Sequence, residues 1–153
     1  GLLDSEVPSN FTFAKVLPTN YQDYMGYPQN ILAVGLDQEE KAILKVWDGL
    51  LNYTSAGGSY QYTYIPSIAA NDPVSFQPYS TFSEPIITGD SGDPSFIIID
   101  NTLVLLSCWY TAVSGPFITN RYNKVNQLIN TLSPNEGYSL TPINLELVYH
   151  KYS

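Results

Sequence analysis

The segment Gly89-Asp90-Ser91-Gly92-Asp93-Pro94 joins two runs of apolar, strand-forming residues, 84–88 and 95–99. Glycine lets the backbone turn sharply and lets another molecule approach the main chain closely. Successive N–H groups in such a loop can converge on one point and hold an anion. The segment therefore predicts a tight polar loop between two strands, with the Ser91 hydroxyl presented as a nucleophile.

This loop resembles the Gly-Asp-Ser-Gly-x-Pro signature of trypsin-like (chymotrypsin-fold) serine peptidases. Five fixed residues at ordinary usage arise by chance in a chain of 153 residues about once in ten thousand sequences. The resemblance implies a mostly β fold. It implies a six-stranded antiparallel barrel, the second of the family's two barrels, closed by one amphipathic C-terminal helix and followed by an extended tail.

The resemblance also assigns roles within the loop. Ser91 is then the catalytic nucleophile of a serine endopeptidase, and the backbone N–H groups of Gly89 and Ser91 form the oxyanion hole. In the known serine-protease cases each oxyanion-hole donor stabilises the transition state by roughly 3–4 kcal/mol. Asp90 corresponds to a residue that organises this loop in the family.

A substrate-binding region follows from the same resemblance. Cys108-Trp109-Tyr110 is similar to the family's Ser-Trp-Gly strand, which hydrogen-bonds an extended peptide substrate. Tyr110 replaces the glycine that keeps the specificity pocket open. Pro85, at the pocket base, and the adjacent Ile86 offer no charge. We therefore expect a peptide or protein substrate, but neither a deep pocket nor a preference for lysine or arginine.

The catalytic base is the largest departure from the family pattern. A serine hydroxyl is activated when a histidine takes its proton and a carboxylate orients that histidine. The single histidine of the sequence, His150, lies in the C-terminal tail, where we expect a surface residue. Leu2-Leu3 and Val16-Leu17-Pro18 resemble the family's stretch just downstream of the catalytic aspartate. We therefore expect the histidine and aspartate in an upstream barrel, in cis or on a second chain, and expect this chain alone to be inactive.

Three regions follow from this interpretation. Residues 1–18 form a connector from the missing upstream barrel and run along a sheet. Residues 19–132 form the C-terminal barrel and its helix. Residues 133–153 are a tail that adds a strand or wraps the domain.

The spacing of apolar residues predicts where the strands and the helix lie. Alternating or apolar runs predict strands at residues 29–37, 41–47, 60–65, 95–99 and 103–109, and residues 114–118 predict a turn and a last short strand. Asp100-Asn101 predicts a tight turn between the two strongest strands. Apolar residues recur at helical spacing from Tyr122 to Leu132, which predicts a helix over residues 120–132. Thr119 or Asn120 is its expected cap, and Pro134 lies just beyond its end.

Composition limits the partners and the setting. The net charge of −8 argues against nucleic acid or an anionic membrane, both of which attract clustered lysine and arginine. No apolar run reaches the length of a membrane-spanning helix, so we expect no membrane insertion. Charged residues make up 13% of the chain, and 13 tyrosines are present. This balance favours a β-rich domain in an extracellular or virion-associated setting.

Cys108 is the single cysteine, which excludes an internal disulfide and a cysteine-based metal site. Its apolar run predicts an inert buried thiol. No cofactor and no metal ion are expected, because the acidic residues 37–40 are typical of a solvated turn.

Three alternatives remain open. The lipase-like Gly-Asp-Ser hydrolases need an Asp-x-x-His motif, and the residues before His150 do not provide one. Haloacid-dehalogenase-type phosphatases need an Asp-x-Asp motif that the sequence lacks. Both families also predict parallel α/β folds with several helices. The third alternative is a catalytically inactive trypsin-fold domain with a structural or binding role in a surface or virion protein.

Overall fold

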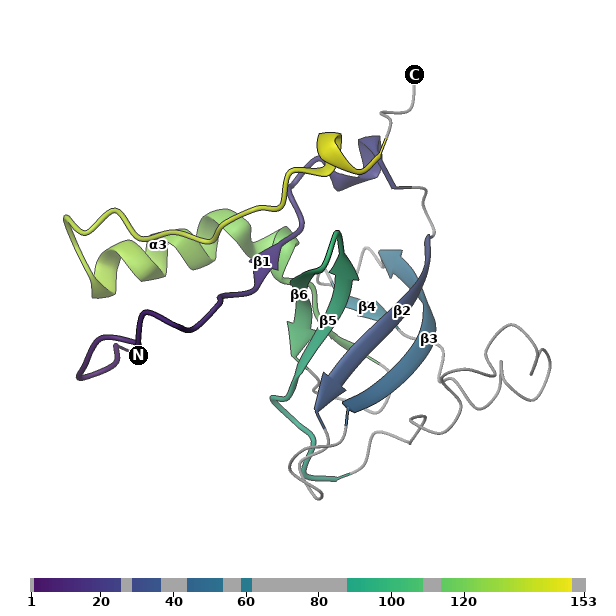
Figure 1. The fold of residues 1–153 in the computed structure, drawn as a ribbon, viewed down its shortest axis with the longest axis horizontal. Helices are drawn as coiled ribbons and strands as arrows, with labels where there is room; N and C mark the ends of the chain where they lie inside the picture. Colours follow the sequence, from purple (N-terminus) through teal and green to yellow (C-terminus); the bar gives the residue numbers. More distant parts are fainter. Residues whose placement is uncertain are drawn as a thin grey trace.

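A computed structural model describes residues 2–25, 29–36, 44–53, 59–61, 88–108 and 114–149 (Figure 1). The described residues form a mixed α/β structure: one mixed sheet, not closed into a barrel, and a 15-residue helix near the C-terminus. The strands are β1 (Lys15–Val16), β2 (Gln29–Leu36), β3 (Leu44–Tyr53), β4 (Ser59–Gln61), β5 (Pro94–Ile99), β6 (Thr102–Cys108) and β7 (Ser114–Pro116).

The strand order across the sheet is β1-β6-β5-β2-β3-β4-β7. Strands β2, β3 and β4 form an antiparallel meander, and the β5–β6 hairpin joins it where Phe96 pairs with Val34. Strand β7 returns to pair with β4. The strands predicted within residues 29–37, 41–47, 60–65 and 114–118 are therefore recovered in part, and residues 37–43 and 62–65 lie outside the described ranges.

Strand β1 makes the sheet mixed, whereas the sequence predicted an antiparallel one. Lys15 and Val16 pair with Val104 and Leu105 of β6 in the parallel sense. A parallel pair cannot be joined by a tight turn and needs a long connection. Here the connection includes β2 to β5, so no local pattern indicated the pairing. The prediction that residues 1–18 run along a sheet holds at Lys15 and Val16, and their role as a connector stays a prediction.

The β5–β6 hairpin is built as the sequence predicted. Asp100 and Asn101 at its tip have φ values of 49° and 55°. Two consecutive positive φ values define a type I′ turn, whose twist matches that of the flanking strands, and Asp and Asn tolerate this conformation. Side chains on β5 then alternate, with Ile97 and Ile99 buried and Ile98 exposed.

Apart from the side chains buried on the sheet, a cluster of buried side chains lies where the connector meets the C-terminal tail. It contains Val16, Leu17, Tyr21, Tyr24, Met25, Phe117, Ile143 and Leu145. The rings of Tyr21 and Phe117 meet edge to face with centroids 5.2 Å apart. The tail is held to the connector by backbone bonds from the Val16 N–H to the Thr141 carbonyl and from the Ile143 N–H to the Val16 carbonyl. The tail therefore runs beside the connector, with an isolated β-bridge between Val16 and Pro142.

Short 3-10 helices flank this cluster. Helix η1 (Tyr21–Asp23) follows the connector and helix η4 (Leu145–Leu147) ends the described tail. The Tyr24 hydroxyl donates to Glu146 Oε1 at 2.9 Å, which joins the two. Hydrogen bonding to Glu146 raises the pKa of the Tyr24 hydroxyl, because the bond favours its protonated form.

The predicted C-terminal helix is confirmed. It begins as the 3-10 helix η3 (Ile118–Arg121) and continues as α3 (Tyr122–Leu132). The predicted cap is wrong, because Thr119 and Asn120 lie inside η3. At the N-terminus of η3, and again at the N-terminus of α3, the N-cap residue makes no capping hydrogen bond through its side chain. Thr119 is buried instead, and its Oγ1 donates to the Leu17 carbonyl at 3.0 Å. This bond fastens the start of the helix to the connector.

Candidate functional site

The Ser91 loop is a tight turn, as predicted. The Asp93 N–H donates to the Asp90 carbonyl at 3.1 Å, so Ser91 and Gly92 occupy the two central positions. Gly92 has φ +96°. A positive φ at the second central position is the mark of a type II turn, which favours glycine there. Ser91 therefore stands on a sharp bend, outside any helix.

Gly89, at the start of the loop, also has a positive φ, of +109°. A Cβ added at Gly89 or Gly92 would meet no atom of the described residues within 4 Å. The two glycines are therefore required by backbone conformation and not by crowding. The open space around them leaves the main chain of the loop accessible to another molecule.

Asp90, the first residue of the turn, and Ser91, its first central residue, differ in burial. Asp90 is 3% exposed, whereas Ser91 is exposed to solvent. A carboxylate removed from water needs compensating polar interactions, and Asp90 is among the residues that make one. Asp90 is therefore turned into the protein, whereas Ser91 lies on the surface of the turn.

The loop leads directly into the β5–β6 ladder, which contains a β-bulge. Ser95 pairs with Ser107, but Phe96 pairs with Leu105, so Leu106 is an extra residue on β6. One extra residue moves all side chains beyond it to the opposite face. Leu106 and Ser107 are consequently both buried, and Cys108 is exposed.

This bulge explains why the predicted burial of the Cys108 thiol is wrong. Cys108 pairs with Pro94, so its thiol lies on the exposed face beside the end of the Ser91 loop. Partial burial raises the pKa of the Cys108 thiol, and the negative charge of Asp93 raises it further. The sequence carried no signal for the bulge, and the proximity of Asp93 to Cys108 depends on it.

The predicted site residues are brought together in part. Ser91, Gly89 and Cys108 come from the loop and from the strand end that pairs with its exit. The remaining predicted substrate-binding residues, Pro85, Ile86, Trp109 and Tyr110, lie outside the described residues, as does His150.

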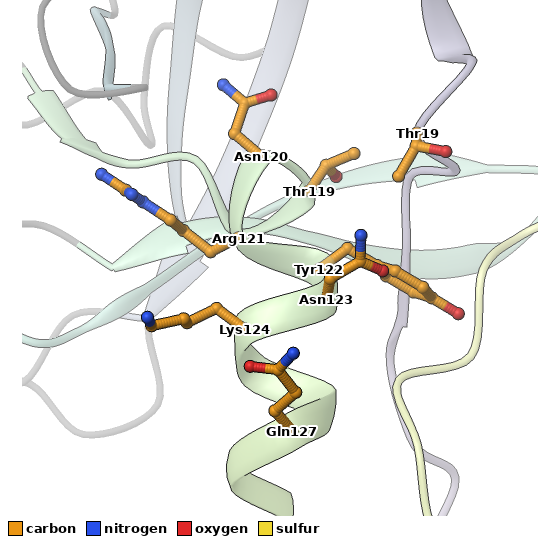
Figure 2. A pocket seen from close by; sticks show the side chains of 8 residues that line it. All are labelled: Thr19, Thr119, Asn120, Arg121, Tyr122, Asn123, Lys124 and Gln127. Carbon is orange, nitrogen blue, oxygen red and sulfur yellow. The ribbon is translucent and has the colours of Figure 1, made fainter.

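A second candidate region is a polar hollow of about 530 Å³ at the start of the helix (Figure 2). Arg121 and Lys124 point to one side of the helix, and Tyr122 points to the other. The Thr119 hydroxyl is already committed to the Leu17 carbonyl. Because these side chains do not converge on one point, the Ser91 loop remains the better candidate.

No group of three or more metal-ligating side chains occurs among the residues with described positions. Over the same residues, no helix is long and apolar enough to cross a membrane.

Comparison with known proteins adds no relative. No family model matches the chain, and neither the curated proteins nor the solved structures include a match.

Proposed function

We propose that this chain is the carboxyl-terminal half of a trypsin-like serine endopeptidase. The observation that carries the proposal is the geometry at Ser91: an exposed serine on a closed turn, between glycines with φ of +109° and +96°, next to a buried Asp90. This combination suits a nucleophile better than a packing turn, because a turn that only joins two strands does not need both glycines and a buried carboxylate.

The reaction follows from the chemistry of an activated serine. Ser91 Oγ attacks the carbonyl carbon of a peptide bond while a histidine takes the hydroxyl proton. The amides of Gly89 and Ser91 stabilise the negative oxygen of the tetrahedral intermediate. The intermediate collapses to an acyl-enzyme, the leaving amine takes the proton from the histidine, and water then hydrolyses the ester.

The base must come from outside the Ser91 loop. Figure 1 places residues 145–149, the last described part of the chain before His150, at the opposite end of the molecule from residues 88–93. We therefore assign the histidine and aspartate to an upstream barrel, in cis or on a second chain. In this proposal the present chain alone is inactive.

The strand order supports the finer proposal of a six-stranded antiparallel barrel. Without β1, the order is β6-β5-β2-β3-β4-β7, and its two end strands are consecutive in the sequence. Strands β6 and β7 also lie within contact distance of each other. Pairing between these two strands is all that is needed to close the sheet.

The substrate in this proposal is an extended peptide beside the end of β6. Cys108 is exposed next to Pro94, at the exit of the Ser91 loop. The resemblance to the peptidase family assigns Trp109 and Tyr110 to the segment that pairs with the peptide, and Pro85 and Ile86 to the pocket base. An extracellular or virion-associated setting suits such a protein.

An inactive structural or binding domain of a surface or virion protein is the second candidate. The observation in its favour is the set of large apolar side chains left exposed along α3 and the N-terminal segment. Such a domain retains the turn but gives Ser91 no base.

Labelling with a fluorophosphonate tests the proposal, since the probe reacts with activated serines. We expect the natural full-length protein to be labelled, Ser91→Ala to abolish labelling, and Ser139→Ala, which removes another exposed serine, to leave it unchanged. The chain of 153 residues alone should not be labelled. Absence of labelling in a full-length protein that contains an upstream histidine would refute the peptidase and favour the inactive domain.

A further inference from the structure

A second hollow is lined by residues of the N-terminal segment and of the end of α3. Figure 1 draws the ribbons of these two segments next to each other. We call it the helix groove. Its volume is about 830 Å³. Most of its apolar lining comes from Leu2, Leu3, Phe13, Ile129, Leu132 and Tyr138.

The apolar walls of the helix groove are largely uncovered. Leu3 is 73% exposed and Phe13 is 68% exposed, and Leu132 and Tyr138 are also exposed. Helix α3 has a clear apolar face, yet none of its residues is buried. An amphipathic helix normally buries its apolar stripe against a core. A contiguous apolar surface that remains open in a folded domain marks an interaction site.

The charged residues around the helix groove all have the same sign. They are Asp4, Glu6 and Glu136, each exposed to solvent. A symmetric pair of identical copies would place this acidic rim against itself, which is unfavourable for a chain of net charge −8. The same rim repels nucleic acid and anionic lipid. The charge pattern favours a cationic partner.

We propose that the helix groove is a docking surface for a segment of a partner protein that presents apolar side chains between lysine or arginine residues. The apolar side chains fill the groove and the basic residues lie over its acidic rim. This inference does not involve Ser91, so it is tested separately from the proposed peptidase.

The first test uses a fluorescent peptide of leucines flanked by lysines, and a twin with glutamate in place of every lysine. Fluorescence anisotropy with the full chain should show saturable binding of the lysine peptide and about tenfold weaker binding of the glutamate peptide. Equal affinity for the two peptides, or no binding of either, would overturn the proposal. So would a dimer in light scattering that Phe13→Ser dissociates, because the occupant would then be a second copy.

Two matched pairs of variants locate the binding. Phe13→Ser removes a groove residue, whereas Phe11→Ser removes one that is 61% exposed but outside the groove. We expect the first to weaken binding about tenfold or more and the second to leave it unchanged. Glu6→Gln should weaken binding about two- to fivefold, whereas Asp100→Asn, an exposed acid elsewhere, should not. Equal effects within either pair would show that the peptide binds elsewhere and would refute the assignment.

Charge reversal provides the last test. The triple variant Asp4→Lys, Glu6→Lys and Glu136→Lys should prefer the glutamate peptide. All three positions are exposed, so the fold should be retained, which circular dichroism checks. Retained preference for the lysine peptide in a folded triple variant would overturn the role of the acidic rim.

Discussion

The hydrogen bond between Thr119 and Leu17 offers a direct measure of how firmly the helix is attached to the connector. Thr119 is 2% exposed, and its Oγ1 donates to the Leu17 carbonyl at 3.0 Å. Thr119→Val keeps the side-chain shape but removes the donor, and Leu17 is itself fully buried. A buried carbonyl that loses its donor costs about 1–3 kcal/mol. We expect the free energy of unfolding to fall by that amount.

The chain contains a matched control for this substitution. Thr131 Oγ1 also donates to a backbone carbonyl, that of Gln127 at 2.9 Å, but this bond is exposed on α3. Thr131→Val should change stability by less than about 0.5 kcal/mol, because water replaces the lost partner. The two variants thus remove the same chemical group in two different environments.

Urea unfolding followed by fluorescence of the two tryptophans gives both values. A constant slope of free energy against urea shows that the variants change stability and not the extent of unfolding. In thermal unfolding the Thr119 effect should appear as a fall in Tm of roughly 2–4 °C per kcal/mol. If the losses of unfolding free energy in Thr119→Val and Thr131→Val agree within about 0.5 kcal/mol, the buried bond to the Leu17 carbonyl does not fasten the helix to the connector.

Three further predictions concern the turn, the thiol and the tyrosine. Gly92→Ala should lower the free energy of unfolding by about 1–2 kcal/mol, because alanine is strained at φ +96°. Gly92→Asn should lower it by less, because asparagine tolerates positive φ better. Equal stability of Gly92→Ala and wild type would contradict the turn geometry. Cys108 should react with iodoacetamide more slowly than free cysteine at neutral pH because its pKa is raised, and Asp93→Asn should accelerate the reaction; an unchanged rate would disprove the contribution of Asp93. The raised pKa of Tyr24 means that its bond to Glu146 stabilises the fold fully below about pH 10, the usual tyrosine pKa, and is lost as pH rises through the folded-state pKa. The stability difference between wild type and Tyr24→Phe should therefore shrink at alkaline pH. A difference that stays constant from neutral pH to well above the tyrosine pKa would show that the bond to Glu146 does not stabilise the fold.

Features fixed by neighbouring residues could be predicted from the sequence. The turn at Asp100-Asn101 needs only two residues that tolerate positive φ, and the helix after Thr119 needs only apolar residues at the right spacing. The bend at Ser91 belongs to the same class, because the glycines on either side of it determine the local backbone. The structure has these turns and this helix at the predicted positions.

Features set by distant pairing could not be predicted. The parallel pairing of β1 with β6 joins segments separated by most of the sheet, which made the sheet mixed instead of antiparallel. Because Leu106 is an extra residue on β6, Cys108 lies on the surface, although it follows a largely apolar run. Thr119 looked like a helix cap from its position, but it is bonded to the Leu17 carbonyl, which is 102 positions away. In each case a long-range partner overrode a local preference.

The backbone of Val16 pairs with a neighbouring segment on each side, which limits how far this chain can be shortened. Val16 pairs with Leu105 of β6 on one side and bridges to Pro142 on the other. A chain shortened before Pro142 would uncover Val16 and Leu17 together and leave the backbone of Val16 without its outer neighbour. The opening and closing segments are therefore one cooperative unit with the sheet, and trimming either to obtain a smaller domain would loosen the other.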